Sequence, residues 1–384
     1  MSAIDQQVPA GNLYPPLDPP PRYLFGPGPT MVDPRVYKAL AQPIVGHLDP
    51  YFIQVMNDVQ QLLKAPFGTA EGTTLVISGT GSSGMEASVA NFVDPGTKCA
   101  VFVSGYFSDR ISEMMKRQGA QLVRSEKPWG ETFSDAEAEE FIRREKPEVV
   151  AYVQAETSTG AFQPGRAICQ VAHDIGALVI ADCVTSLGGV PVEFDRTGID
   201  VAFSCTQKGL SCPPGLSPVA LSALATSWLR DRTTPPRSWY FDLKLIYDYS
   251  TVSHRYHHTA PISMFYALRE ALLIIADEGV EKRWQRHRDC HAEFVKGIES
   301  MGLRMFVPEA HRITTLNTVR IPEGISETKV RQRLVSDAGI EIAGGFGPLA
   351  GKILRIGVMG PLATKENVRF LLKELKKALD AEGR

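Results

Sequence analysis

The chain has 384 residues, of which 43% are hydrophobic and 22% charged, and its formal net charge is −2. This composition is typical of a globular protein in water, and the charge gives no sign of a nucleic-acid-binding surface or a basic membrane-binding face. The length exceeds what one ordinary core organises, so we expect two domains, and no apolar stretch is long enough to cross a bilayer.

Residues 1–22 are rich in proline and lack a periodic apolar pattern, which predicts an extended N-terminal arm. Beyond the arm, short apolar runs alternate with segments of helical spacing. This alternation predicts a mostly parallel sheet with helices on both faces. The expected strands are residues 73–78, 99–103, 148–153, 177–181, 201–204 and 217–221, and the expected helices are residues 51–67, 85–92, 111–118 and 167–175.

The pattern changes after about residue 265. One long helix is expected from about Ser263 through Arg288, and shorter strands and helices follow it. We therefore expect an arm (1–22), a large domain (23–265) and a small α+β domain (266–384) that begins with the long linking helix. The later elements are expected at residues 316–321 and 353–356 (strands) and at residues 327–335 and 363–379 (helices).

A glycine-rich segment, residues 79–84 (GTGSSG), follows an expected strand and precedes an expected helix. Its spacing matches the dinucleotide-binding fingerprint. The next strand, however, ends in residues 103–106 (VSGY), without an acid to hold a ribose hydroxyl, so a nicotinamide-dependent dehydrogenase is a remote alternative. Glycines still let the backbone approach a phosphate at a helix N-terminus. The segment is either a phosphate-binding loop or an ordinary glycine turn.

Two further apolar runs end abruptly in chemistry-bearing residues. Residues 177–181 end at Asp182, and residues 201–204 are followed by small polar residues and Lys208. The carboxyl end of a parallel strand is where such folds bind ligands, and a carboxylate there is costly unless it is paired. A lysine between apolar runs has a depressed pKa and can form a Schiff base with an aldehyde. Taken singly, each residue could also be an ordinary cap or loop residue.

The three features together fit one cofactor, pyridoxal 5′-phosphate (PLP). Its phosphate needs N–H groups, its ring nitrogen needs an anion, and its aldehyde needs an amine. The order of the elements resembles the class V aminotransferases of PLP fold type I, and within them the alanine–glyoxylate and serine–glyoxylate (serine–pyruvate) enzymes. The matching segments span almost the whole chain and are FGPGPT (25–30), VGHLDP (45–50), ETSTG (156–160), DCVTSLGG (182–189), TQK (206–208), YHHT (256–259) and LRIG (354–357).

The resemblance implies the roles of the reacting residues. Lys208 would hold the cofactor as a Schiff base and later move the substrate proton, while Asp182 would keep the ring nitrogen protonated. Arg355 would grip the substrate carboxylate through its planar guanidinium. Thr157 would place its hydroxyl near both this carboxylate and the cofactor ring, and Gly28 would lie beside the substrate. A structural ion pair is the alternative role for Arg355. The implied fold is a large domain with a mostly parallel, seven-stranded type of sheet and a smaller C-terminal α+β domain.

The resemblance also implies how the cofactor is held. Phe107 aligns with the aromatic residue that stacks on the ring, although core packing is its alternative role. Tyr256 and Thr259 align with residues that reach the phosphate from the neighbouring subunit, so the active site would be shared across a homodimer. Some relatives carry histidine where Ser82 stands. On the same chain the phosphate would be bound by Thr80, Gly81, Ser82 and Gln207.

The implied reaction is transfer of the amino group of a small amino acid, alanine or serine, to glyoxylate or pyruvate in two half-reactions with ping-pong kinetics. Alternatives within the same superfamily are ureidoglycine–glyoxylate or aminoethylphosphonate aminotransfer and a desulfurase-like lyase. A desulfurase would need an exposed, reactive cysteine; Cys205 and Cys212 flank the lysine. A relative that keeps the fold without catalysis is a further alternative.

The remaining cysteines and histidines point to no metal. The six cysteines form no close Cys-x-x-Cys pair and lie largely in apolar runs, which is typical of free thiols in a reducing compartment. His257 and His258 are adjacent, but the sequence offers no evident third ligand. We therefore expect a cytoplasmic enzyme without a metal, a membrane anchor or a nucleic-acid partner.

Overall fold

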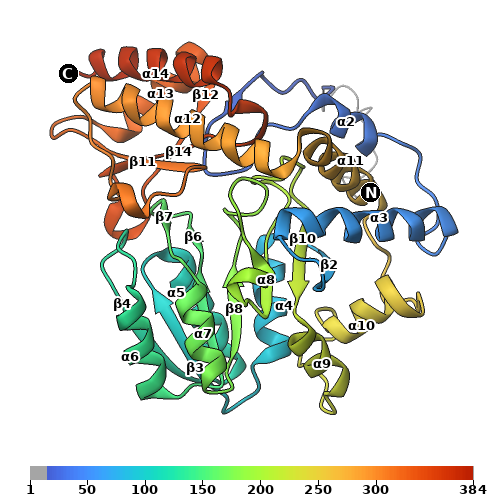
Figure 1. Ribbon diagram of the computed structural model, residues 1–384. Coiled ribbons are helices and arrows are strands. Elements are labelled where there is room, and N and C mark those ends of the chain that lie inside the picture. Colours follow the sequence, from blue (N-terminus) through green and yellow to red (C-terminus); the bar gives the residue numbers. More distant parts are fainter. Residues whose placement is uncertain (1–14, 384) are drawn as a thin grey trace, which may run out of the picture.

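The computed structural model describes residues 15–383, and its two units, a large α/β unit and a smaller C-terminal unit, lie one above the other (Figure 1). Residues 1–14 of the predicted arm lie outside the described residues, and residues 15–22 form no helix or strand. Among the helices of residues 15–383, none combines the length and the hydrophobicity that crossing a bilayer would require.

The large unit is built on a seven-stranded sheet in the order β2-β10-β9-β8-β5-β3-β4. All of its strands run in the same direction except β10, which is antiparallel to both of its neighbours. The predicted mostly parallel sheet is confirmed. The strands are β2 (Thr73–Ser78), β3 (Lys98–Val103), β4 (Gln121–Glu126), β5 (Val149–Val153), β8 (Leu178–Asp182), β9 (Val201–Phe203) and β10 (Leu216–Leu221), and a hairpin of β6 (Ala155–Glu156) and β7 (Ala161–Phe162) follows β5.

Both faces of this sheet are buried, because successive side chains of a strand point to opposite sides. In β2, Val76 belongs to the core on one face, whereas Leu75 and Ile77 belong to the core on the other. The inner strands are therefore almost continuously apolar, as the sequence predicted. The helices of this unit are α2 (Pro34–Leu40), α3 (Pro50–Phe67), α4 (Gly81–Phe92), α5 (Tyr106–Gln118), α6 (Asp135–Glu145), α7 (Arg166–Asp174), α8 (Phe194–Thr197), α9 (Ala223–Asp231), α10 (Leu243–Tyr247) and α11 (Ile262–Glu278).

The smaller unit packs helices on a three-stranded antiparallel sheet in the order β11-β14-β13. The N-terminal segment joins it, because β1 pairs with β12 in parallel and Phe25 is fully buried in its core. Residues 23–25 thus belong to the C-terminal unit although they precede the large sheet in the chain. The elements are β1 (Tyr23–Leu24), α12 (Val280–Ser300), β11 (Leu316–Arg320), α13 (Glu327–Ala338), β12 (Ile340–Glu341), β13 (Ala343–Gly344), β14 (Ile353–Gly357) and α14 (Lys365–Asp380).

The single long helix expected from Ser263 through Arg288 is wrong: two helices, α11 and α12, take its place. Gly279 separates them, and its φ of +83° is a conformation that glycine adopts readily and that ends a helix. Buried residues of α11 belong to the core of the large sheet, together with residues of α2 and α3. We therefore propose a domain boundary at Gly279 rather than at residue 265.

The sequence analysis also missed the edge strand β4. Its letters, QLVRSE, mix charged and apolar residues, and each of its side chains is either exposed or half-buried. An edge strand has a neighbour on one side only, so it needs less apolar surface than an inner strand. That is why its sequence lacked the apolar run by which the inner strands were recognised.

Candidate active site

The carboxyl ends of β2, β3, β5, β8 and β9 meet at one edge of the sheet because these strands run in the same direction. The glycine segment at residues 79–82 follows β2, and Phe107 lies in the first turn of α5 after β3. Thr157 follows β5 and the short strand β6, Asp182 ends β8, and Lys208 follows β9. The fold therefore gathers, at one edge, residues that are up to 129 positions apart in the chain, from 79 to 208.

Lys208 is buried at this edge, and burial lowers the pKa of its amine. Its ammonium group forms no ion pair with any residue of the described part of the chain. Thr30 fixes the backbone beside it, because its hydroxyl donates to the carbonyl oxygen of Lys208 at 3.0 Å. A β-carbon at Gly28 would lie 2.7 Å from Cδ of Lys208, so the lysine stem occupies the space that a side chain at Gly28 would need.

Asp182 is the last residue of β8 and is 1% exposed. Burial raises the pKa of its carboxyl group to about 7, although the N–H group of Val184 donates to Oδ1 at 2.8 Å and opposes the rise. No ion pair with another described residue compensates its charge. A buried carboxylate in this state is stabilised by a cationic group brought in from outside the chain.

Arg355 reaches the same region from β14 of the smaller unit and is 3% exposed. Its Nε donates to the carbonyl oxygen of Gly344 at 2.6 Å and its Nη1 to that of Thr157 at 3.2 Å. The guanidinium carbon lies 3.9 Å from the ring centroid of Phe346. Burial lowers its pKa to about 10, so it remains charged at neutral pH. It pairs with no carboxylate of residues 15–383, which disfavours the structural ion pair.

Lys208 and Arg355 line a cavity of about 310 Å³ between the two units. Five of the residues expected at the site line it directly, and Asp182 is not among its lining residues. Residues that sequence reasoning missed complete the wall: Phe346, which stacks on Arg355, and a segment before it at residues 341–343. The expected residues in the wall are Gly28, Phe107, Thr157, Lys208 and Arg355.

The helix expected at residues 85–92 already starts within the glycine segment, with Thr80 as the N-cap residue of α4 and Gly81 and Ser82 in its first turn. The side chain of Thr80 makes no capping hydrogen bond, so the first N–H groups of the helix stay available to an anion. Oε1 of Gln207 is buried without a hydrogen-bond partner among the described residues. Arg110, which the sequence analysis did not single out, donates from Nη1 to the hydroxyl of Ser82 at 3.2 Å.

Glu156 is a second residue that sequence reasoning missed, and it holds the start of α5 in place. Its buried carboxylate accepts hydrogen bonds from the N–H groups of Phe107 (3.2 Å), Ser108 (3.1 Å) and Ser158 (3.1 Å). A carboxylate at a helix N-terminus is favourable because the helix dipole is positive there. Glu156 therefore fixes the backbone of Phe107 relative to the segment that carries Thr157. No pattern in the sequence indicated this role.

Tyr256 and Thr259 do not join the cavity within one protomer. Tyr256 is 55% exposed and lines a separate pocket of about 150 Å³, and Thr259 is exposed. The neighbouring residues His257 and His258 form hydrogen bonds with other groups of the protein. Nδ1 of His257 lies 2.8 Å from Nδ1 of His258, whose Nε2 lies 2.6 Å from the hydroxyl of Ser78. Burial lowers the pKa of His258 to about 4.

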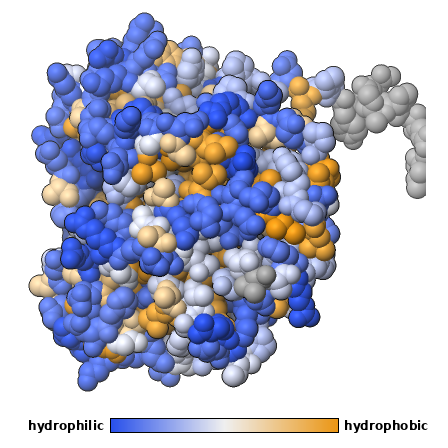
Figure 2. Space-filling model, turned by 45° about the vertical axis from the view of Figure 1, so that its right-hand side comes forward, coloured by the Kyte–Doolittle hydropathy of each residue, from blue (hydrophilic) through white to orange (hydrophobic). Residues whose placement is uncertain are grey.

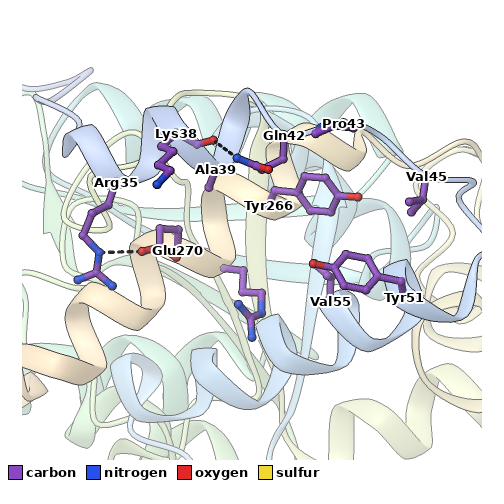
Figure 3. Close-up of a pocket in the computed structure, with 11 residues that line it drawn as sticks. Arg35, Lys38, Ala39, Gln42, Pro43, Val45, Tyr51, Val55, Tyr266 and Glu270 are labelled. Atoms are coloured by element: carbon purple, nitrogen blue, oxygen red, sulfur yellow. Dashed lines mark hydrogen bonds and ion pairs between the residues drawn. The ribbon is translucent and has the colours of Figure 1, made fainter.

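The largest cavity of the described residues, about 650 Å³, lies elsewhere, between α2, α3 and α11 (Figure 3). None of the residues expected at the active site lines it. Arg35 pairs with Glu270 across it at 2.8 Å, and the rings of Tyr51 and Tyr266 meet edge to face.

Figure 2 brings forward the side of the molecule that lies to the right in Figure 1, and apolar areas interrupt its hydrophilic surface.

Comparison with known proteins agrees with this geometry. Residues 22–371 match the family described as aminotransferase class-V. The crystal structure of an alanine–glyoxylate aminotransferase from Nostoc sp. superposes with a TM-score of 0.93 at 43% identity and covers 95% of this chain and 97% of that one. The (S)-ureidoglycine–glyoxylate transaminase of Bacillus subtilis is 37% identical over 378 residues, which cover 94% of this chain and 91% of that protein.

A third relative, the alanine–glyoxylate aminotransferase of Callithrix jacchus, is 36% identical over 376 residues, which cover 97% of this chain and 91% of that protein. The nicotinamide-dependent dehydrogenase is therefore wrong, and the glycine segment belongs to a different fold. Because the family match and the relatives span nearly the whole length, the chain belongs to the class-V aminotransferase family and is a transaminase of PLP fold type I that uses pyridoxal phosphate.

Proposed function

We propose that the chain moves the amino group of a small amino acid, alanine or serine, to glyoxylate or pyruvate by a ping-pong mechanism. The observation that carries this proposal is Arg355, a buried guanidinium without an acidic partner in residues 15–383, beside the same cavity as Lys208. Amino donor and oxo acid both carry a carboxylate next to the reacting carbon. One arginine can therefore place both substrates against one amine.

The residues of the site fit pyridoxal phosphate. The buried carboxylate of Asp182 forms no ion pair within residues 15–383, which suits a protonated ring nitrogen, and its pKa falls back when such a group approaches. Within the same residues, Gln207 has a buried oxygen without a hydrogen-bond partner, and Thr80 leaves the first N–H groups of α4 uncapped. We propose that Thr80, Gly81, Ser82 and Gln207 hold the phosphate, that Asp182 holds the ring nitrogen, and that Phe107 packs on the ring.

Lys208 is the proposed proton carrier. When bound, the cofactor supplies an electron sink for the electrons left when the substrate Cα loses its proton. Burial lowers the pKa of the Lys208 amine, so a larger share of it is neutral and able to accept that proton at working pH. Thr30 holds the backbone of Lys208 through a hydrogen bond, and the absence of a side chain at Gly28 leaves room for the lysine stem beside the cavity.

The cavity favours small substrates. Its volume of about 310 Å³ stands at the lower end of ordinary ligand sites, and the cofactor must share it. Phe346 covers the Arg355 guanidinium. It also narrows the end of the cavity at which we expect Arg355 to bind the substrate carboxylate. A two- or three-carbon amino acid suits the remaining space.

Ureidoglycine–glyoxylate transfer is the second candidate, and the Bacillus subtilis relative supports it, being a transaminase of that name at 37% identity. The desulfurase-like lyase has no such support. Cys205 and Cys212 are buried, and burial raises the pKa of Cys205 to about 12 and also raises that of Cys212. A thiol in this state is not the exposed nucleophile that a desulfurase needs.

Two measurements test the proposal. Incubation with alanine alone should release about one pyruvate per active site and then stop, because the amino group stays on the enzyme until an oxo acid collects it. A panel of alanine, serine, glycine and ureidoglycine against glyoxylate and pyruvate then ranks the pairs by kcat/KM. Continuous turnover with alanine alone would contradict amino transfer, and a preference for ureidoglycine would establish the second candidate.

We further propose a homodimer in which Tyr256 and Thr259 of each protomer complete the partner's phosphate site. Their exposure in one protomer and their distance from its own cavity support this, as do exposed apolar residues on α2, α3 and the connecting loop. Those residues are Tyr37, Ile44, Leu48 and Tyr51. A Tyr256→Ala subunit mixed with a Lys208→Ala subunit should give one defective and one intact site per heterodimer. An inactive mixture of the two inactive variants would contradict a shared site.

A further inference from the structure

Arg110 lies where two parts of the proposed cofactor site meet, the phosphate loop and the start of α5. It is the fifth residue of α5, and α5 packs against α4, whose first turn holds Ser82. Its Nη1 donates to the hydroxyl of Ser82 at 3.2 Å. Its guanidinium carbon lies 4.9 Å from the ring centroid of Phe107 and 5.1 Å from that of Tyr106. The charge is thus held between the phosphate loop and the residue proposed to cover the ring.

The charge of Arg110 has no anion of its own. Within residues 15–383 it pairs with no carboxylate, whereas its helix neighbour Arg117 pairs with Glu113 at 2.8 Å and Arg124 pairs with Asp109 at 2.8 Å. Asp109, the residue directly before Arg110, thus turns to Arg124 instead. A half-buried arginine that is oriented by two aromatic rings and a hydroxyl, but lacks an acid, is arranged for an anion that comes from outside.

We propose that Arg110 is a further cofactor-binding residue, whose guanidinium binds the phosphate group that α4 receives. This inference rests on the proposed placement of the phosphate at Thr80, Gly81 and Ser82. In one protomer, the other two buried cations near the site have separate tasks, since Lys208 meets the aldehyde and Arg355 the substrate carboxylate. Without Arg110, the phosphate would face N–H groups and hydroxyls only. A guanidinium can form bidentate, charge-assisted hydrogen bonds with a phosphate, which those neutral groups cannot.

The position of Arg110 favours the phosphate over the substrate. It does not line the cavity that holds Arg355 and Thr157, and the one side-chain hydrogen bond that it makes to the described residues is to the phosphate loop. Ser82 has a short neutral side chain. The arginine therefore adds positive charge where Ser82 itself cannot. A competing role, in which Arg110 acts on Asp182 and hence on the cofactor ring, predicts a different outcome in the test below.

The experiment compares a ligand that has the phosphate with one that lacks it. Holoenzyme is purified, the cofactor is removed, and the dissociation constants of pyridoxal phosphate and of pyridoxal are measured by absorbance for the full-length chain. The variants are Arg110→Gln, which removes the positive charge, and Arg110→Lys, which keeps the charge but cannot make the bidentate contact of a guanidinium. Arg117→Gln is the matched control, because its side chain lies on the same helix, is 78% exposed and is paired with Glu113.

We expect Arg110→Gln to raise the dissociation constant of pyridoxal phosphate by about tenfold or more, as loss of a charged hydrogen bond does. Pyridoxal should bind as it does to the wild type, within about twofold, and Arg110→Lys should give a smaller rise, again for pyridoxal phosphate alone. Arg117→Gln should change neither constant. Inorganic phosphate should compete with pyridoxal phosphate more weakly in Arg110→Gln than in the wild type.

Two results would overturn the inference. One is an unchanged affinity for pyridoxal phosphate, and the other is an equal loss for both ligands, which would place Arg110 on the ring or in the framework. If Arg110→Gln does not fold, Arg110→Lys decides by the same comparison. Failure of the proposed function can be told apart from failure of this inference. In that case, borohydride reduction would attach the cofactor to a lysine other than Lys208.

Discussion

Two cavities of the described residues, one between α2, α3 and α11 and one beside Lys208, differ in size and in how the charges around them are compensated. The cavity between α2, α3 and α11 is the larger of the two, at about 650 Å³, and both of its arginines form ion pairs: Arg35 with Glu270 at 2.8 Å and Arg269 with Asp58 at 2.6 Å. The cavity beside Lys208 measures about 310 Å³. There Lys208, Asp182 and Arg355 are buried and none of them pairs with another described residue.

This difference shows which physical property identifies the active site. Burying an unpaired charge costs several kcal/mol, so a fold retains such a charge where a ligand compensates it. Volume carries no such cost, because a surface groove is simply filled by water. The predictions below test this contrast by altering Lys208, Arg355 and Gly28, which line the smaller cavity, and Asp182, which lies at the same edge of the sheet.

The largest effect is expected at Lys208. Lys208→Ala should lower kcat by roughly 10³-fold or more, since the variant loses the group proposed to move the proton. The cofactor should still bind without a covalent bond. Peptide mapping after borohydride reduction should find the cofactor on residue 208 in the wild type and on no lysine in the variant. An active alanine variant would show that another base does this work.

Arg355→Ala should raise KM for the amino donor and for the oxo acid alike, by roughly 10- to 100-fold, because both present a carboxylate to the same guanidinium. Arg269→Ala, in the larger cavity, serves as the control and should leave both constants unchanged. Steady-state kinetics at varied concentrations of both substrates provides the comparison. A rise for only one substrate would mean that Arg355 does not serve both half-reactions.

A smaller effect, about tenfold in kcat, is expected for Gly28→Ala. The added β-carbon would lie 2.7 Å from Cδ of Lys208, so the lysine must move, and the φ of +121° adds backbone strain. Gly26→Ala is the control from the same loop, since a β-carbon there would meet nothing within 4 Å. Equal activities of the two variants would show that the contact between Gly28 and Lys208 does not matter for turnover.

The smallest effect concerns the stability of the cofactor-free protein. Burial raises the pKa of Asp182 from 3.8 to about 7 in the folded chain, so the folded state holds this proton more tightly than the unfolded state. Stability is therefore lost as pH rises from about 4 to about 7, and the full cost is present above 7. Asp182→Asn removes this cost.

The Asp182→Asn variant should melt a few degrees higher than the wild type at pH 8, and the two should converge near pH 4. Thermal unfolding of both cofactor-free proteins across this range checks the sign. With pyridoxal phosphate added, the order should reverse at pH 8, because only the wild type offers the ring nitrogen an anion. Equal melting temperatures of the cofactor-free variant and the cofactor-free wild type at pH 8 would contradict an unpaired buried carboxylate at Asp182.

Much of the site could be predicted from the sequence because its residues mark the ends of strands. The buried strands are continuous apolar runs, and a run that stops at Asp182 or shortly before Lys208 shows where chemistry begins. The glycine segment before α4 carries its own signal, since small residues at a helix start let a phosphate approach. These signals are local, and each depends on a few neighbouring residues.

The tertiary structure alone decided which distant residues meet. Gly28 lies against a lysine 180 positions later, and Phe346 covers Arg355 from a loop without a recognisable pattern. Glu156 holds the first turn of α5 through N–H groups that every residue possesses, so its letter says nothing about its partners. The edge strand β4 and the break at Gly279 were missed for a related reason: exposure on one side and a single glycine are weak signals beside a long apolar pattern. The sequence by itself determined where each strand ends and what chemistry stands there, because both depend on neighbours in the chain. Only the folded chain decided which charges are left without partners, because pairing depends on distances that the sequence does not contain.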